Sequence, residues 1–490
     1  MDLTDAKPSV TALARLARTV FSFRAMLALG LALVTVCTVS NRFNDPDLWW
    51  HLKAGEIVWN THSVPNQDLF SFTAYGQPST EHEWLGQLSI YATYKLGGYT
   101  GLMMWLAILG SLLFVLVFIL CYRYSGNALV AFMGGLCAWF FGTVGLAIRP
   151  LLLGHICLVM ELILLDLAAR NRRWLWLLPP LFGVWVNCHG SFFFGLGVLF
   201  VYCVCSGIDG RWGLVVAEPS DRKTRTALAA VFGACVIALC LNPVGVQVLV
   251  YPLKVLGQQS TSMNAIDEWL PPDLRSSRGM ALIAAMIAVF LLPLVRRSEL
   301  RLQELLLVSV SFGLAIQHSR MLFVFGIVVS PVLCRLLGPV LEERRDGDHP
   351  ILNALLMSAF LAAAIWTFPG ADRISKQIRQ ANPAGAVAYI RRAGLSGPML
   401  NDYRFGAYLI WTMPQHKVFI DGRGDVFDPT GILAAYGRWA TLDEDPNLLL
   451  EKYRIRFCLL STNAPMSHVL PYLAGWRRAY SDDMAAVYVR

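Results

Sequence analysis

Long apolar runs separated by short polar segments occupy most of the chain up to about residue 370. A helix that crosses the hydrocarbon core of a bilayer needs roughly 17–25 mainly apolar residues. Runs of about this kind, several of them short, lie at 25–40, 100–122, 127–147, 151–168, 174–188, 191–207, 226–242, 279–295, 303–317, 320–338 and 350–368. The pattern therefore predicts an α-helical polytopic membrane protein with about 11 spans.

The distribution of Lys and Arg between alternate loops predicts how the chain is inserted. With the N-terminus in the cytoplasm, 18 Lys and Arg residues fall in cytoplasmic segments and 8 in the longer outside loops. Such a bias is typical of the cytoplasmic side of membrane proteins. The first apolar run follows several basic residues and has no small-residue cleavage site. Residues 1–24 are therefore predicted to be a cytoplasmic segment before a retained signal anchor.

Polar segments outside the spans predict a second, smaller domain. Residues 41–98 form a large first outside loop, and 243–278 form another, whose apolar stretch 246–255 is re-entrant or interfacial. An odd number of spans places the tail, 370–490, outside and leaves 25–369 as the transmembrane domain. Within the tail we expect a helix at 384–393 and short strands at 398–401, 417–420, 457–461 and 484–489. The tail thus predicts a small C-terminal α/β domain on the outer face.

Composition and charge narrow the class of protein further. Of the 490 residues, 56% are hydrophobic and 15% charged, whereas a soluble globular chain carries about 25% charged residues. The net charge of +8 comes from loops beside the spans, which favours anionic lipid and not nucleic acid as the partner. Most of the 11 cysteines lie inside apolar runs, where they act as small hydrophobic residues. Their spacing indicates neither a disulfide framework nor a metal site.

The densest polar chemistry follows the first span, in Asn-Arg-Phe-Asn-Asp-Pro-Asp-Leu-Trp-Trp-His at 41–51. Asp45 and Asp47 flank Pro46, which favours an extended backbone at Asp45 and would place both carboxylates on one side. Two such carboxylates repel each other unless a cation, an arginine or a shared proton relieves them. The segment is therefore either a catalytic acidic pair at the membrane surface or a surface turn with an interfacial aromatic belt. Trp49 and Trp50 suit sugar stacking and lipid anchoring alike.

A second motif, Thr-Glu-His-Glu-Trp-Leu-Gly-Gln at 80–87, opens an expected amphipathic helix. Glu81 and Glu83 are candidate metal or substrate ligands, or acids that a helix N-terminus favours through its dipole. The histidines do not reach zinc spacing. No phosphate-binding P-loop, G-x-S-x-G or H-E-x-x-H motif occurs in the sequence, which argues against a nucleotide-driven pump, a serine hydrolase and a zincin.

These features together resemble the GT-C superfamily of polytopic membrane glycosyltransferases. The resemblance is greatest to bacterial members with D-P-D-x-W-W-H after the first span and E-H-E-W later in the loop. Their tails carry N-D-Y-x-x-G-x-Y-L-I-W and then V-F-I-D-G-R, which match 401–411 and 418–423 of this chain. The resemblance runs from about residue 24 to the C-terminus.

The resemblance implies a polyprenyl-phosphate-linked sugar donor and an acceptor hydroxyl on a glycan, a lipid or a protein. It implies a bacterial inner-membrane protein with a periplasmic tail. Asp47 would be the catalytic base, and Asp45 would orient it or bind a divalent cation. The expected substrate-binding residues also include the arginines suited to the donor phosphate and a histidine at an outer span end: Trp49, Trp50, His51, Glu81, Glu83, Arg149, His189 and Arg320.

The candidate residues also suit purely structural roles, and a non-enzymatic function also fits the sequence. Arg149 and Arg320 also suit snorkelling at span ends, His189 suits a turn, and 421–425 suits a surface loop or a cap over the catalytic cavity. The alternative to an enzyme is a membrane transporter or an envelope-assembly scaffold. Transporters usually show internal repeats and polar residues at mid-bilayer. Here the polar residues gather at the outer span ends, which favours the enzyme.

Overall fold

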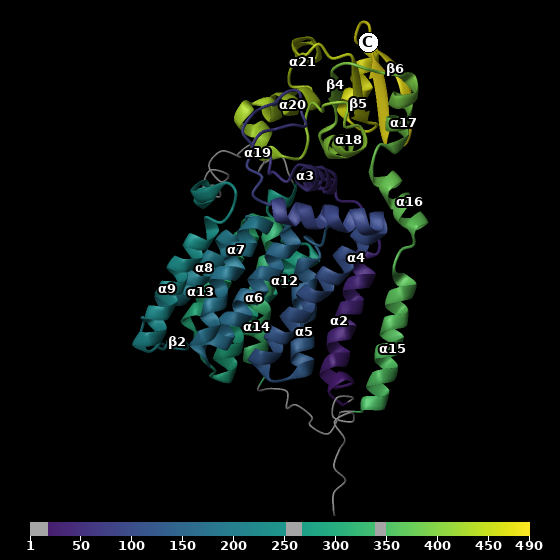
Figure 1. Ribbon diagram of the computed structural model, residues 1–490. Coiled ribbons are helices and arrows are strands. Elements are labelled where there is room, and N and C mark those ends of the chain that lie inside the picture. The colour runs from purple at the N-terminus through teal and green to yellow at the C-terminus, as the bar shows by residue number, and fades with distance from the viewer. Residues whose placement is uncertain (1–17, 251–266, 339–348) are drawn as a thin grey trace, which may run out of the picture.

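The computed structural model describes residues 18–250, 267–338 and 349–490. It consists of a bundle of long helices with a small mixed domain at one end (Figure 1). The bundle helices are α2 (Phe23–Val39), α4 (Trp84–Ser125), α5 (Ala128–Gly142), α6 (Leu151–Ala168), α7 (Leu178–Cys188), α8 (Phe192–Cys205), α9 (Arg222–Leu239), α12 (Ser277–Arg296), α13 (Leu302–Gln317), α14 (Leu322–Leu337) and α15 (Pro350–Thr367). Short 3₁₀ helices connect them: η1 (Arg172–Leu177), η2 (Gly245–Leu249), η3 (Asp267–Trp269) and η4 (Ser319–Met321).

The helices agree with a multi-pass membrane protein. Each of the eleven apolar stretches predicted from the sequence overlaps one of these helices. Among the described residues, five helices are long and apolar enough to cross a membrane, and four more apolar helices are shorter. The five long ones begin at Trp84, Leu151, Ser277, Ser319 and Pro350. The apolar stretch predicted at 246–255 lies largely outside the described residues.

Helix α4 is bent where the outside loop meets the expected span. Gly98 has φ 57° and ψ −147° inside the helix, a conformation that glycine adopts far more readily than other residues. The part before Gly98 lies across the end of the bundle that faces the small domain, and the part after it runs down into the bundle (Figure 1). The first part is the helix expected after Thr80, and the second contains the predicted span.

The first loop contains one helix that the sequence analysis missed, α3 (Leu48–Thr61). It begins directly after the acidic pair, because Asp47 has φ −80° and ψ −17° and forms its N-cap. It ends at His62, which lies in the left-handed region with φ 55°. Helix α3 lies between the bundle and the small domain (Figure 1). The expected run of extended backbone through the acidic pair is therefore wrong from Asp47 onward, where the chain already turns into the helix.

A small sheet lies at the opposite end of the bundle from the α/β domain (Figure 1). Its strands β1 (Gly210–Trp212) and β2 (Val215–Ala217) pair antiparallel, and β2 pairs parallel with β3 (Leu300–Arg301).

The C-terminal domain is built on a four-stranded sheet in the order β4-β5-β7-β6. Strands β4 (Met399–Asn401) and β5 (Phe457–Ser461) are parallel, and β5, β7 (Ala485–Val489) and β6 (Arg477–Ser481) are antiparallel neighbours. The helices around it are α16 (Ala371–Ala381), α17 (Ala384–Ala393), η6 (Tyr403–Phe405), α18 (Gly406–Thr412), α19 (Gly424–Phe427), η7 (Asp428–Thr430), α20 (Ile432–Ala440), α21 (Pro446–Lys452), α22 (Pro465–Val469) and η8 (Leu470–Tyr472). The helix predicted at 384–393 and three of the four predicted strands are confirmed.

The fourth predicted strand, 417–420, is wrong as a member of this sheet. It pairs instead with the first loop, through a parallel bridge between Ser71 and Val418. The Phe72 N–H donates to the Val418 carbonyl, and the Val418 N–H donates to the Phe70 carbonyl, both at 3.0 Å. Ala74 of the same loop belongs to the buried core of the small domain. The loop and the tail therefore fold together, although some 340 residues separate them in sequence.

Candidate active site

Three carboxylates surround one arginine at the junction of the bundle, the first loop and the small domain. Arg149, between α5 and α6, pairs through Nε with Oδ2 of Asp45 at 2.5 Å and through Nη2 with Oδ2 of Asp47 at 3.2 Å. Its Nη1 lies 2.9 Å from Oε1 of Glu268 in η3. Burial alone would lower the pKa of Arg149, but the three carboxylates raise it well above its ordinary value. The arginine therefore stays charged and relieves the repulsion between the two aspartates.

The two aspartates are also tied to each other. The backbone N–H of Asp47 donates to Oδ1 of Asp45 at 2.9 Å, an Asx turn that starts helix α3. Burial raises the pKa of Asp47 to about 6, with Asp45 and Glu268 adding to the rise and Arg149 opposing it. The Asp47 side chain is 25% exposed and Asp45 only 4%. Asp47 is therefore the member of the pair that a substrate can reach, and it titrates close to neutral pH.

The small domain forms a wall of this site through Gly422. A Cβ placed on Gly422 would collide with Oδ1 of Asp47, so only a glycine lets the backbone approach the carboxylate this closely. The next residue, Arg423, is buried and binds Asp421 through two hydrogen bonds of 2.8 and 2.7 Å. It also pairs with Asp68 of the first loop at 2.7 Å. This buried ion cluster of Asp68, Asp421 and Arg423 joins the loop to the tail beside Asp47.

The two tail motifs hold each other in place. The Asn401 side chain accepts from the Phe419 N–H and donates to the Ile420 carbonyl, both at 2.8 Å. Gly406 packs so closely on this segment that a Cβ there would collide with the Ile420 carbonyl. The N-D-Y-x-x-G motif therefore supports the strand-like segment that presents Asp421 and Gly422 to the site.

A second acidic group lies beside two histidines. Oε1 of Glu83, the N-cap of α4, is 3.3 Å from Nε2 of His189 and 3.6 Å from Nε2 of His82. Burial, with the neighbouring carboxylate of Glu81, raises the pKa of Glu83 to about 8. Glu81 itself accepts a hydrogen bond of 2.9 Å from Gln87. At neutral pH Glu83 is therefore mostly a neutral acid.

Both histidines beside Glu83 are neutral. The Ser191 N–H donates to Nδ1 of His189 at 2.9 Å, which fixes the proton of the neutral ring on Nε2, facing Glu83. Burial and the charge of Arg320 lower the pKa of His189 well below its ordinary value. The ring of His82 faces the Thr80 carbonyl through Nδ1, and burial lowers its pKa to about 4. The group is therefore a neutral hydrogen-bonding cluster.

Arg320, the second expected phosphate ligand, lies over the ring of Trp269 at 4.4 Å. Trp269 directly follows Glu268, the third partner of Arg149. Arg320 forms no ion pair with any residue that the structure describes. The two arginines therefore share one region, but only Arg320 retains donors that no carboxylate occupies.

The aromatic residues after the acidic pair pack at the contact between the first loop and the tail. Trp49 is 1% exposed, and its ring meets Tyr408 of α18 edge to face at 5.0 Å. The expected sugar stacking on Trp49 is therefore wrong, because bundle and tail cover its ring. Trp50 packs on His51 at 3.7 Å. Burial and Arg149 lower the pKa of His51 well below its ordinary value.

No group of three or more metal-ligating side chains close enough to hold an ion occurs among the described residues. Asp45 and Asp47, the candidate cation ligands, are occupied by Arg149. A divalent cation at this position would have to replace the guanidinium. The two carboxylates therefore fit an acidic pair whose repulsion Arg149 relieves better than they fit a metal centre.

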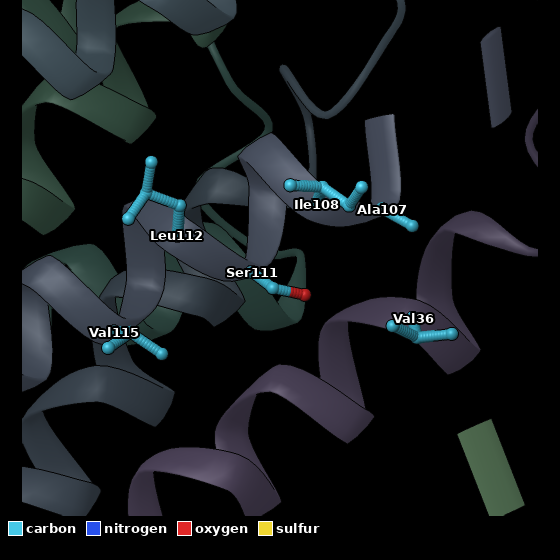
Figure 2. Close-up of a pocket in the computed structure, with 6 residues that line it drawn as sticks. All are labelled: Val36, Ala107, Ile108, Ser111, Leu112 and Val115. Carbon is cyan, nitrogen blue, oxygen red and sulfur yellow. The ribbon is translucent and has the colours of Figure 1, made fainter. Parts of the chain in front are cut away.

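Two grooves contain none of the charged residues of the site. One, of about 400 Å³, is lined by apolar side chains of α2 and α4 and by Ser111, as Figure 2 shows. The other, of about 620 Å³, lies between the end of α3 and the start of α4, where Trp59, Ser63 and Trp84 line it. The second groove reaches the residue directly after Glu83.

Sequence reasoning missed several residues of this junction, above all Glu268, Gly422 and Asp68. Glu268 lies 119 residues from Arg149 and belongs to no motif. The proximity of Gly422 and Asp47 also had no local signal. The only available clue was the polar loop 421–425, which the sequence analysis noted as a candidate cap.

No protein-family model matches the sequence, and no curated protein matches it. Among solved structures the fold matches the oligosaccharyltransferase AglB of the archaeon Archaeoglobus fulgidus. The form tethered to an acceptor peptide with the NVT sequon is 13% identical with a TM-score of 0.58, covering 90% of this chain and 70% of that one. The apo form is 12% identical with a TM-score of 0.54, covering 89% and 69%. A complex with an inhibitory peptide and a dolichol-phosphate is 12% identical with a TM-score of 0.53, covering 88% and 69%.

At this level of identity the likeness concerns the fold. The chain therefore shares the fold of this oligosaccharyltransferase. The arrangement of apolar helices with a domain at one end is likewise that of a multi-pass membrane protein.

Proposed function

We propose that this protein is a GT-C-type glycosyltransferase that moves a sugar from a polyprenyl-phosphate-linked donor to an acceptor hydroxyl. The observation that carries the proposal is the arginine-relieved acidic pair at the junction of bundle and tail, with Asp47 accessible and titrating near neutral pH. The fold shared with a lipid-dependent sugar transferase supports it. The acceptor, a glycan, a lipid or a protein, approaches from the side of the small domain.

Asp47 acts as the base in this scheme. Its carboxylate takes the proton of the acceptor hydroxyl while the hydroxyl oxygen attacks the anomeric carbon and the bond to the donor phosphate breaks. The phosphate leaves with the electron pair of that bond, so no protein acid has to protonate it. Arg149 and Asp45 hold the Asp47 carboxylate in place.

Arg320 is the residue we assign to the donor phosphate. Its guanidinium has no carboxylate partner among the described residues, and an arginine fork can bind two phosphate oxygens. Arg149 is the weaker candidate, because three carboxylates already occupy its nitrogens. Glu81, Glu83, His189, Trp50 and His51 remain substrate-binding candidates on the walls of the same junction.

Localisation and cofactor belong to the same proposal. We place the protein in a bacterial inner membrane because the resemblance implies it, and the 18-to-8 bias of basic residues supports a cytoplasmic N-terminus and a small domain on the outer face. A divalent cation at Asp45 and Asp47 would have to displace Arg149, so we expect the reaction to proceed without one. Activity that survives exhaustive chelation with EDTA would assign the reaction to the arginines alone.

The test uses the full chain in proteoliposomes with radiolabelled polyprenyl-phosphate sugars. Wild-type protein is expected to release polyprenyl phosphate and label an acceptor, and Asp47→Asn should reduce this at least ~100-fold, the lower range for a general base. The matched control is Asp372→Asn, an exposed aspartate on α16. Full transfer by a folded Asp47→Asn protein would remove the base assignment. Movement of intact donor across the bilayer without sugar release would indicate a transporter instead.

A further inference from the structure

Two arginines meet at one threonine, apart from the cluster around Arg149. Arg42, which follows α2, donates from Nη1 to the backbone carbonyl of Thr143. Arg278, in the first turn of α12, donates from Nη2 to Oγ1 of the same threonine at 2.9 Å. Thr143 is the C-cap of α5 and is 5% exposed. Two guanidinium groups are thus held close together by one buried, neutral residue.

The positive charge of this pair is not compensated by the described part of the chain. Among the residues that the structure describes, neither Arg42 nor Arg278 forms an ion pair. Burial and the charge of Arg278 lower the pKa of Arg42, with no carboxylate opposing them. The N-terminus of the 20-residue helix α12 adds further positive potential. Two like charges held together in this way favour an anion between or beside them.

One donor of the pair is buried and unused. Nε of Arg278 has no hydrogen-bond partner among the described residues, although it is shielded from solvent. A buried donor left without an acceptor costs roughly 1–3 kcal/mol, more when the group is charged. Thr143 cannot satisfy it, because its hydroxyl donates to the Phe140 carbonyl at 2.9 Å and already accepts from Nη2. An acceptor from outside the chain would satisfy it.

The position of the pair indicates where such an anion comes from. Arg42, Thr143 and Arg278 lie at the ends of α2, α5 and α12 that face the small domain. If these helices cross the bilayer, their ends lie at the depth of the lipid headgroups, where arginine commonly meets phosphate. Among the described residues, the three carboxylates that pair with Arg149 form no ion pair with Arg42 or Arg278, so the two arginines lie outside the contacts of the acidic cluster.

We propose that Arg42 and Arg278 bind the phosphate group of an anionic bilayer lipid, at a site distinct from that of the sugar donor. The lipid would neutralise the pair and tie the ends of α2, α5 and α12 together. This site does not depend on the proposed transfer reaction.

The experiment measures the thermal unfolding of the full chain in detergent from which phospholipid has been removed. Phosphatidylglycerol is then added, with phosphatidylcholine, inorganic phosphate and undecaprenyl phosphate in parallel. We expect phosphatidylglycerol to raise the unfolding temperature of wild-type protein saturably, and Arg278→Gln to weaken its apparent affinity roughly tenfold or more, the effect of losing a charge-assisted hydrogen bond. In the absence of lipid, Arg278→Gln should be at least as stable as wild type, because the repulsion with Arg42 is gone.

Arg42→Gln is the second variant, and Arg275→Gln is the matched control, because Arg275 is exposed and precedes the same helix. The control should respond to phosphatidylglycerol as wild type does. Equal stabilisation of wild type and Arg278→Gln would overturn the proposal. Saturation by inorganic phosphate alone would make this a free-anion site, and a response to undecaprenyl phosphate only would assign the pair to the donor. Either result would refute a separate lipid site.

Discussion

At the scale of single residues, two carboxyl groups of the junction are tuned in different ways. Burial raises the pKa of Asp47, which lies beside Arg149, to about 6. It raises the pKa of Glu83, which lies beside neutral histidines, to about 8. At neutral pH the first is mostly ionised and the second mostly protonated. A general base must be ionised and a carboxyl hydrogen-bond donor must be protonated, so the two groups suit these two roles.

The pH dependence of transfer follows from this pair. Because the base must be ionised, the rate should fall about tenfold per pH unit below about pH 6, as Asp47 becomes protonated. If the neutral Glu83 donates to substrate, the rate should also fall above about pH 8. Glu83→Gln keeps a neutral donor and should remove only the alkaline limb of the profile. A profile of Glu83→Gln identical to that of wild type would show that Glu83 does not limit the rate.

Gly422 supplies a second residue-scale prediction. Its backbone is not in the left-handed region, so alanine is conformationally allowed, and only the collision with the Asp47 carboxylate opposes it. Because that carboxylate can swing aside, Gly422→Ala should fold but transfer sugar at least roughly tenfold more slowly, since a small misplacement of a catalytic group is costly. Gly437→Ala in α20, where a Cβ meets nothing within 4 Å, is the control. Equal transfer rates for the two variants would show that Gly422 does not position the base.

At the scale of elements, the sequence predicted most helices and strands, but not how the first loop and the tail pack together. Apolar runs predicted every bundle helix, short stretches bounded by Gly, Asp and Pro predicted β4, β5 and β7, and the residues after Pro383 predicted α17. Helix α3 was missed because the motif around Asp47 suggested an extended chain, whereas the aspartate caps a helix. The strand-like segment at 417–420 was predicted as a strand of the tail, but it pairs with the first loop. Such long-range pairing leaves no local periodicity to detect.

The buried ion cluster of Asp68, Asp421 and Arg423 gives the prediction at this scale. Arg423 is the cation that compensates two carboxylates with no solvent exposure. Arg423→Leu should destabilise the association of first loop and tail by roughly 3–5 kcal/mol, because it leaves buried charges without a partner. Limited proteolysis should then cut within 62–79 far faster than in wild type. Arg404→Leu, at a side chain that is 66% exposed, should leave the cleavage rate unchanged.

At the scale of the whole molecule, the fold places several basic residues of the predicted cytoplasmic segments at the opposite end of the bundle from the small domain. Arg211 lies on β1 and Arg301 on β3, in the sheet at the far end of the bundle from the tail. Arg222, Lys223 and Arg225 begin α9, directly after β2. The charge bias alone had assigned these residues to the cytoplasm. The structure thus places these basic residues at the end opposite the tail, which agrees with the arrangement that the positive-inside rule predicts, and the orientation itself stays a prediction.

That agreement can be tested without any knowledge of the sugar. Reporter fusions at residue 213, in the turn between β1 and β2, and at residue 480, on β6, are expected to be cytoplasmic and periplasmic respectively. Reversing the basic residues at the start of α9 to Glu should weaken this orientation, because Lys and Arg near span ends hold loops inside. The same change at Arg477 and Arg478, on exposed positions of β6, should not. If both reporters lie on one side, the helices between them cross the membrane an even number of times. If that shared side is the cytoplasm, the site beneath the small domain meets a different leaflet from the one that the proposed lipid-linked donor requires.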